Sequence, residues 1–203
     1  MSTLMRCAGL LFVLFFTPRL ESADAAIDDA AAVQVQRLDT ALLESMQAGP
    51  TLSVVDRYHK LEPTIEQAFD LPLMTSLAVG PDWAGFTPEQ QRAAITAFTR
   101  LTVASYAHNF RVYGGEKFEI DPDIASRGVD KVVQSHLIRP HDQPVSLIYR
   151  MRESGGVWKI IDVYYGSISQ LTTRRSDFAG PLASGGAQGL VTHLNSLSDD
   201  LMK

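Results

Sequence analysis

The spacing of apolar residues along the chain changes from a helical period to a strand period and back again. In the first part, an apolar stripe predicts a helix over residues 27–46, followed by a second helix over 52–69. Pro63 is expected to mark a break or a new first turn in that second helix. A short helix is predicted to begin at Asp70-Leu71-Pro72 and to end near Gly80-Pro81.

The clearest local signal is Thr87-Pro88-Glu89-Gln90, which combines an N-cap hydroxyl, a proline at the first helical position and a glutamine placed to complete a capping box. The helix that follows is predicted to continue to about residue 112, before Gly114-Gly115. Its inward face is expected to consist of Ala94, Ile95, Phe98, Leu101, Thr102, Ser105 and Tyr106.

The period then falls to 2, which predicts strands over 117–120, 129–138, 145–152 and 157–164. Short turns join the last three, so neighbouring strands should be antiparallel. Helical spacing returns after Gly166 and predicts two more helices, over 168–182 and 187–201. The expected fold class is α+β: an antiparallel meander of about four strands, packed with N-terminal and C-terminal helices around an apolar cavity.

The first 25 residues have the form of a cleavable secretory signal peptide. Arg6 supplies the positive charge, residues 10–16 form a short apolar run, and Ala23-Asp24-Ala25 has the small residues of a cleavage site. The single cysteine, Cys7, precedes the apolar run. We therefore expect residues 26–203 to be one exported domain without a thiol.

Composition narrows the functional classes. The 203 residues include 18 basic and 23 acidic side chains, for a formal net charge of −5. Without a block of Lys and Arg, this balance gives no electrostatic indication of nucleic-acid binding. A hydrophobic content of 45% is that of a globular protein and excludes wholesale disorder.

Recognised catalytic and metal-binding motifs are absent from the sequence. The five histidines have no metal-ligand spacing, and no G-x-S-x-G element is present. We therefore expect no metal, no cofactor and no enzymatic activity. One alternative stays open, an acid–base site in which Asp162 acts with His136 or Tyr149. The plainer interpretation is that Asp162 caps a helix or pairs with an arginine, and that His136 lies on a solvated face.

Apolar side chains are plentiful enough to line a cavity, but composition alone does not separate such a cavity from a filled core. A carrier of apolar ligands would use the cavity, because burying each methylene group contributes roughly 0.8 kcal/mol. A third possibility is an adaptor without cargo, whose interior would hold only water-sized voids.

Several motifs in a fixed order resemble the MlaC family. The C-terminal part carries Gly156-Val157-Trp158-Lys159-Ile160-Ile161-Asp162-Val163, then Gly166-Ser167-Ile168-Ser169, Arg174-Arg175-Ser176-Asp177-Phe178 and the stretch 186–194. Upstream, Asp70-Leu71-Pro72, Val79-Gly80, Trp83 and Thr87-Pro88-Glu89-Gln90-Gln91 match in the same order. Within the family, the amino-acid sequence of residues 168–175 is similar to that of the hopanoid-associated branch called HpnM.

The resemblance implies a periplasmic lipid carrier of the kind also called a toluene-tolerance auxiliary protein. Such a shuttle carries phospholipid or hopanoid-type lipid between an inner-membrane ABC transporter and an outer-membrane lipoprotein complex, and touches the membrane complexes only transiently. We expect it to be a monomer. The residues expected to line its cavity are Phe98, Leu101, Tyr106, Leu147, Tyr149, Trp158, Ile160 and Val163. Structural roles are expected for Gly166 at a turn, for an ion pair of Asp162 with Arg174, and for Phe178 at the base of the sheet.

Overall fold

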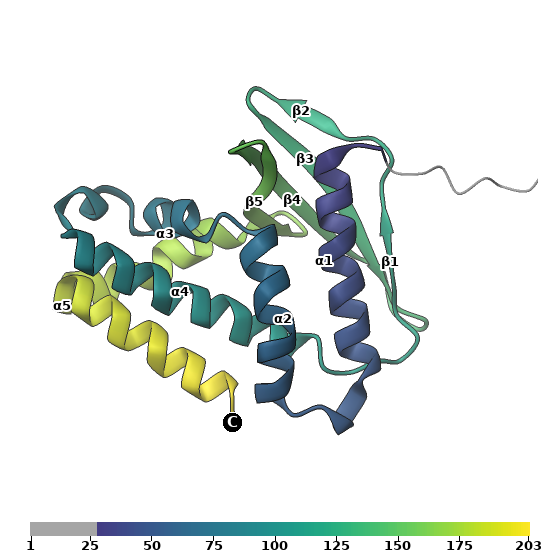
Figure 1. The fold of residues 1–203 in the computed structure, drawn as a ribbon, viewed down its shortest axis with the longest axis horizontal. Coiled ribbons are helices and arrows are strands. Elements are labelled where there is room, and N and C mark those ends of the chain that lie inside the picture. The colour runs from purple at the N-terminus through teal and green to yellow at the C-terminus, as the bar shows by residue number, and fades with distance from the viewer. Residues whose placement is uncertain (1–27) are drawn as a thin grey trace, which may run out of the picture.

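The computed structural model describes residues 28–203, in which helices pack on one antiparallel sheet (Figure 1). The predicted signal peptide, residues 1–25, lies outside the described residues. Helix α1 lies across one face of the sheet, and α2 runs beside it (Figure 1). The α+β fold class predicted from the sequence is confirmed.

The five helices of the described residues lie in one connected layer. Helix α2 contacts α4, which packs along α5, and α3 contacts both α4 and α5. A 3-10 turn joins α1 to α2, and another follows α3. The helices are α1 (Ala30–Gln47), α2 (Val54–Ala68), α3 (Leu71–Val79), α4 (Pro88–Asn109) and α5 (Gln170–Leu201), and the turns are η1 (Gly49–Thr51) and η2 (Gly80–Gly85).

Local sequence signals set the starts of α3 and α4 as predicted. The amide of Gln90 donates to the Thr87 hydroxyl at 3.3 Å, and the Gln90 side chain accepts from the Thr87 amide at 2.8 Å. This reciprocal pair is the predicted capping box of α4. The carboxylate of Asp70 caps α3 in the predicted place by accepting from Leu73 N at 3.1 Å.

Pro63 does not break the second helix, so that prediction is wrong. It lies inside α2, which continues from Val54 to Ala68. Proline removes one backbone hydrogen bond from a helix interior. The neighbouring turns remain helical because Leu61 and Ile65 are fully buried in the core, and their packing offsets that loss.

The strands form the predicted antiparallel meander, in the order β1-β3-β4-β5-β6, with β2 also pairing with β3. Two short strands, β2 and β6, were not predicted, and residues 168–169 belong to β6 rather than to the start of a helix. The strands are β1 (Lys117–Ile120), β2 (Ala125–Arg127), β3 (Asp130–Ile138), β4 (Val145–Ser154), β5 (Val157–Tyr165) and β6 (Ile168–Ser169).

An irregularity in β5 decides which of its side chains face the helices. Asp162 pairs with Arg150 and Ile160 pairs with Met151, so Ile161 is the extra residue of a β-bulge. The bulge shifts the alternation by one residue. Consequently Ile160 and Val163 both lie on the helix-facing side, which a regular strand would not allow.

Helix α5 corresponds to the two predicted C-terminal helices, which meet at a kink. Gly186 has non-helical angles, with φ 57° and ψ −148°, inside the span from Gln170 to Leu201. That backbone region is open almost only to glycine. Helix α5 contacts β5 and β6, and its beginning is bonded to β5 through the Leu171 amide and the Asp162 carboxylate.

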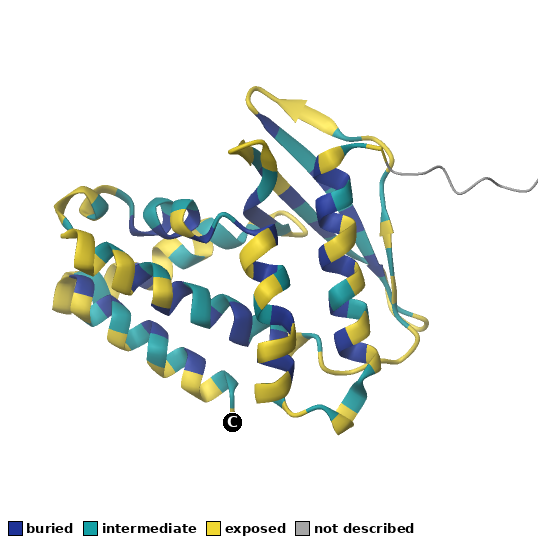
Figure 2. Ribbon diagram, in the orientation of Figure 1, coloured by how far each residue is buried: buried dark blue, intermediate teal, exposed yellow. Residues whose placement is uncertain are grey.

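The core extends from the contact between α1 and the helix-facing side of the sheet into the layer formed by α2, α3, α4 and α5 (Figure 2). Val35, Leu38 and Leu42 of α1 are fully buried, as the predicted stripe requires. On β4, the buried Leu147 and Tyr149 alternate with more exposed residues, so both lie on the helix-facing side of the sheet.

Candidate functional site

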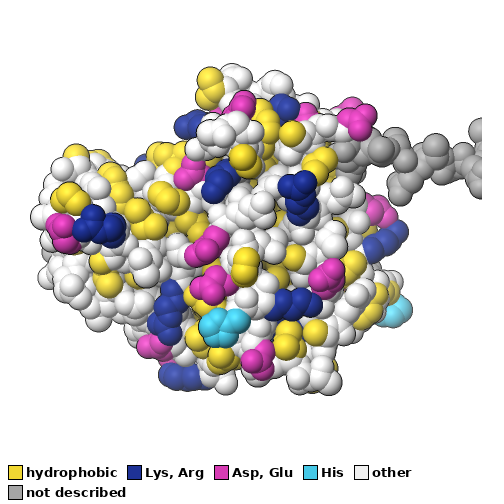
Figure 3. Space-filling model, viewed as in Figure 1, with side chains coloured by type: hydrophobic (Ala, Val, Ile, Leu, Met, Phe, Trp, Pro, Cys, Tyr) yellow, Lys and Arg dark blue, Asp and Glu magenta, His cyan; other side chains and the backbone are white. Residues whose placement is uncertain are grey.

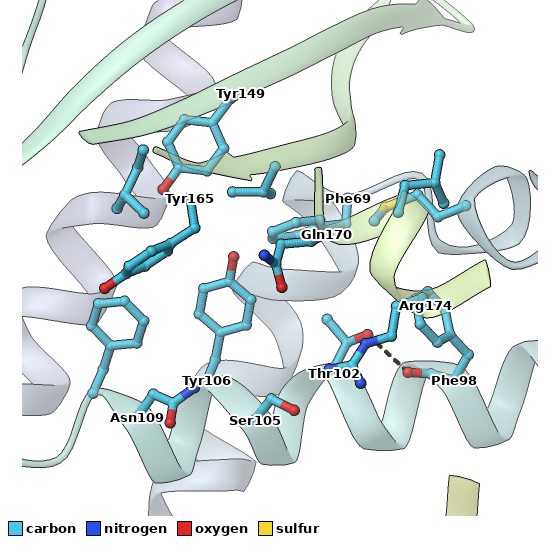
Figure 4. Close-up of a pocket in the computed structure, with 15 residues that line it drawn as sticks. Phe69, Phe98, Thr102, Ser105, Tyr106, Asn109, Tyr149, Tyr165, Gln170 and Arg174 are labelled. Carbon is cyan, nitrogen blue, oxygen red and sulfur yellow. Dashed lines mark hydrogen bonds between the residues drawn. The ribbon is translucent and has the colours of Figure 1, made fainter. Parts of the chain in front are cut away.

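A pocket of about 160 Å³ lies between the sheet and the helices (Figure 4). Helix α4, strands β4 and β5, the junction of α2 with α3, and the first turns of α5 enclose it. Its lining residues are Phe69, Met74, Phe98, Thr102, Ser105, Tyr106, Asn109, Phe110, Leu147, Tyr149, Val163, Tyr165, Gln170, Leu171 and Arg174.

The pocket has a buried apolar floor and a more exposed polar rim. Phe69 and Tyr149 are each 1% exposed, whereas Tyr165 is 53% exposed. The rim also contains Asn109, which is exposed, and Arg174, which is half-buried. This gradient suits an amphipathic ligand, because apolar surface is favourably buried and polar groups stay in water.

Aromatic rings brace the α4 side of the pocket. The ring of Tyr106 packs edge-on against Phe69, with 5.6 Å between centroids, and stacks on Phe110 at the same separation. Phe110 in turn approaches Phe118 of β1 at 6.3 Å. Aromatic pairs at such distances are favourable beyond the area they bury. The rings therefore support one another at the edge of the pocket.

Two polar residues of α4 are satisfied within their own helix. The Thr102 hydroxyl donates to Phe98 O at 2.8 Å, the bond drawn in Figure 4, and the Ser105 hydroxyl donates to Leu101 O at the same distance. Such bonds to the preceding turn let short hydroxyl residues sit in an apolar wall at little cost.

A buried carboxyl group lies behind the floor of the pocket. Asp39 of α1 is 3% exposed, and its Oδ2 accepts from the Ser135 hydroxyl of β3 at 2.7 Å. Its Oδ1 is buried without a hydrogen-bond partner among the described residues. Burial raises the pKa of Asp39 to about 7, although the nearby hydroxyl groups of Ser135 and Tyr149 partly oppose that rise.

Two tyrosine hydroxyls near this carboxyl group remain neutral. Burial raises the pKa of Tyr149 well above its ordinary value, and the neighbouring carboxyl of Asp39 adds to the rise. The pKa of Tyr106 is raised for the same two reasons. Both side chains line the pocket, so its inner end offers neutral hydrogen-bonding groups and no fixed charge.

Five of the eight residues expected to line a cavity surround this pocket, namely Phe98, Tyr106, Leu147, Tyr149 and Val163. The structure places the other three elsewhere. Leu101 and Ile160 are buried in the core, where Ile160 O accepts from Asp70 N at 2.9 Å. Trp158 lies under the ammonium group of Lys131, at 4.6 Å from the ring centroid. The binding role of all eight remains a prediction.

Asp162 anchors the start of α5, but not through the expected ion pair. Its Oδ2 accepts from the Ser169 hydroxyl at 2.7 Å, and its Oδ1 accepts from Leu171 N at 3.0 Å. The expected partner, Arg174, instead pairs with Asp177 one turn further along α5, at 3.4 Å. The predicted Asp162–Arg174 pair is therefore wrong, because one helix amide and one hydroxyl already occupy the Asp162 carboxylate.

The other two expected structural residues lie at the ends of this same connection. Gly166 has a φ of 60° in the turn between β5 and β6, a conformation that favours glycine. Phe178 is 1% exposed and packs edge-on against Phe98 of α4, with 5.8 Å between centroids. Its aromatic partner is thus in the helical layer rather than at the base of the sheet.

The residues of the alternative acid–base site do not converge. Tyr149 points to the helix-facing side of the sheet, whereas Asp162 and His136 lie on the opposite face. His136 of β3 pairs with Ser146 of β4, and Asp162 of β5 pairs with Arg150 of β4. The two partners on β4 are four residues apart. That is about 13 Å along a strand, and β4 also separates the two. This geometry gives that site no support.

The described part of the chain shows neither a metal-binding cluster nor a membrane-spanning helix. Residues 28–203 contain no group of three or more His, Cys, Asp and Glu side chains able to hold a metal ion. None of the described helices is long and apolar enough to cross a membrane. Basic and acidic side chains are interspersed on the face shown in Figure 3.

Sequence reasoning missed lining residues that tertiary packing brings in. Phe69 and Met74 come from the α2–α3 junction, which no local pattern connects to the sheet. Thr102 was predicted on the inward face of its helix with Phe98, but not as a lining residue, and Asn109 continues the same stripe of α4. The sequence did not indicate that Asp39 is buried, because a charged residue beside the apolar stripe of a helix is ordinarily expected to be exposed.

The fold and the pocket define an α+β domain that holds an apolar binding pocket between a meander sheet and its helices. A model of the MlaC protein family matches residues 36–196. The chain belongs to the MlaC family. It is also similar to a solved structure described as the phospholipid-binding protein from Ralstonia solanacearum in complex with a phospholipid. The identity is 27% and the TM-score 0.74, over 86% of this chain and 99% of that chain.

Proposed function

We propose that this chain is a periplasmic lipid-binding shuttle, which carries phospholipid or hopanoid-type lipid between the envelope membranes together with an ABC transport system. The observation that carries the proposal is the apolar pocket with a polar rim. The similar Ralstonia protein supports it, because that protein is described in complex with a phospholipid. The signal peptide predicted over residues 1–25 supports export.

The pocket volume favours a carrier over an adaptor without cargo. An adaptor predicts only water-sized voids, whereas about 160 Å³ is several times the roughly 30 Å³ that one water occupies in the liquid. The same volume is smaller than the roughly 300–1,000 Å³ of pockets for drug-sized ligands. Lipid uptake therefore requires the pocket to widen, by movement of α4 or the first segment of α5 away from the sheet.

The function is tested by lipid uptake from phospholipid vesicles, measured by native mass spectrometry of the re-isolated protein. The wild-type protein, residues 26–203, should retain lipid. Val163→Phe should strongly reduce uptake, because Val163 is 7% exposed and lines the pocket. The matched control is Val129→Phe, the same change at a residue 75% exposed and outside the pocket lining.

Circular dichroism separates a blocked pocket from a misfolded protein. Added bulk in a packed interior costs about 1–3 kcal/mol, and the pocket lowers this cost by accepting the ring. A wild-type protein that takes up no lipid would contradict the proposed function. Equal uptake by the Val163→Phe and Val129→Phe variants would show that lipid binds elsewhere.

A further inference from the structure

The rim of the pocket carries one cation in an otherwise uncharged lining. Of the 15 lining residues, all in the described part of the chain, only Arg174 carries a fixed charge. The remaining lining is aromatic, aliphatic, hydroxyl or amide. In a chain with a net charge of −5, a single arginine at the mouth of an apolar pocket selects for the sign of a ligand's polar group.

The environment of Arg174 leaves its guanidinium group open to a stronger partner. The ion pair with Asp177 has a separation of 3.4 Å, and the Asp177 side chain is 43% exposed. Exposed pairs of this kind contribute little. Arg174 itself is 29% exposed and, in Figure 4, extends from α5 toward Thr102 of α4. An anion at the mouth could therefore replace Asp177 without breaking the fold.

The neighbouring arginine on α5, Arg175, binds a backbone carbonyl and does not line the pocket. Arg175 donates from its guanidinium to Leu77 O at 2.6 Å, and so binds a carbonyl in the last turn of α3. It is outside the pocket lining. Gln170 precedes Arg174 by one helical turn and also lines the pocket, so an amide and a guanidinium face the same opening.

We propose that Arg174 binds the anionic headgroup of the cargo lipid, and thereby selects phosphate-bearing lipids over uncharged ones of the hopanoid or diacylglycerol type. This inference rests on the proposed function. A guanidinium group presents paired donors that fit two oxygens of a phosphate. The headgroup lies at the rim beside Arg174 and Gln170, and the acyl chains extend toward the buried floor at Phe69 and Tyr149.

The test is competition between two lipids with the same acyl chains, dioleoylphosphatidylglycerol and dioleoylglycerol, in mixed vesicles. The wild-type protein should retain the phosphate-bearing lipid in clear excess. Arg174→Gln should lower its retention about tenfold, because a hydrogen bond to a charged group is lost. Retention of dioleoylglycerol should not change. Arg174→Lys should restore part of the preference, since it keeps the charge without the paired donors.

The control variant is Arg92→Gln, which removes the same charge from an arginine that is 68% exposed and paired with Glu89 on α4. It should keep the wild-type preference. Equal retention of both lipids by the wild-type protein would overturn the role of Arg174 while leaving the carrier function intact. Retention of neither lipid would overturn both proposals. Displacement of bound lipid by millimolar inorganic phosphate would also overturn the inference, since it would indicate a site for free phosphate.

Discussion

The carboxyl group of Asp39 connects helix α1 to the sheet behind the pocket, and replacing it with asparagine tests how the fold treats its charge. Asparagine has nearly the shape of a protonated carboxyl group and still accepts the hydrogen bond from the Ser135 hydroxyl. It cannot ionise. The variant therefore isolates the free energy that folding loses when Asp39 carries a charge.

The size of the effect follows from the pKa. Burial raises the pKa of Asp39 from 3.8 to about 7, so the folded protein binds this proton more tightly than the unfolded chain. Each tenfold difference in proton affinity corresponds to about 1.4 kcal/mol. The stabilising contribution of the protonated group is complete below pH 4 and is lost as pH rises toward 7. Between pH 5 and pH 8 the loss is about 3 kcal/mol.

Urea unfolding, followed by circular dichroism, measures the effect at several pH values between 5 and 8. The stability of Asp39→Asn relative to the wild-type protein should rise by about 3 kcal/mol across this range. Asp82→Asn, the same change on the exposed turn after α3, controls for the altered net charge. Parallel stability curves for Asp39→Asn and the wild-type protein would refute the reasoning, because they would mean that Asp39 ionises equally in both states.

Three further substitutions test the remaining supports of the fold. Asp130→Asn should lower stability by about 2 kcal/mol at pH 7, because Arg150 and Arg152 pair with Asp130 and lower its pKa. In urea titrations this difference should shrink as pH falls below 4, the opposite trend to Asp39. Asp162→Ala should cost about 2 kcal/mol in unfolding free energy and increase amide hydrogen exchange at the start of α5. Gly186→Ala should lower the midpoint of thermal unfolding, because its φ of 57° and ψ of −148° strain alanine by about 1–3 kcal/mol.

Local signals predicted most of the fold, because its helix starts and strand faces depend on neighbouring residues. The capping box at Thr87 needs only four consecutive residues, and the inward face of β4 follows from strict alternation. The bulge at Ile161 is different. It arises where β5 is matched to the Arg150–Met151 step of β4, a pairing that the β5 sequence alone does not contain. Pro63 was misjudged because tertiary packing of α2 outweighs one missing hydrogen bond.

The candidate site could be predicted only in the parts that regular elements supply. Leu147 and Tyr149 follow from the strand period, and Phe98 from the helical period. The pocket position of Arg174 and the burial of Asp39 could not be predicted from the polarity of their side chains. One is a charged residue at an apolar pocket, and the other is a carboxyl buried in the stripe of a helix. Their surroundings come from elements distant in sequence, so only the assembled fold gives them their roles.

Whether apolar residues fill a core or line a pocket depends on what keeps them apart, and here aromatic rings do so. Tyr106 is held between Phe69 and Phe110, each at 5.6 Å, and Phe110 is held in turn by Phe118. Aromatic side chains have few rotamers, so these rings cannot turn inward to fill the pocket as flexible aliphatic side chains would. The same composition with leucine at these positions would support an ordinary core. The pocket is thus a property of side-chain stiffness and arrangement, which a count of hydrophobic residues does not contain.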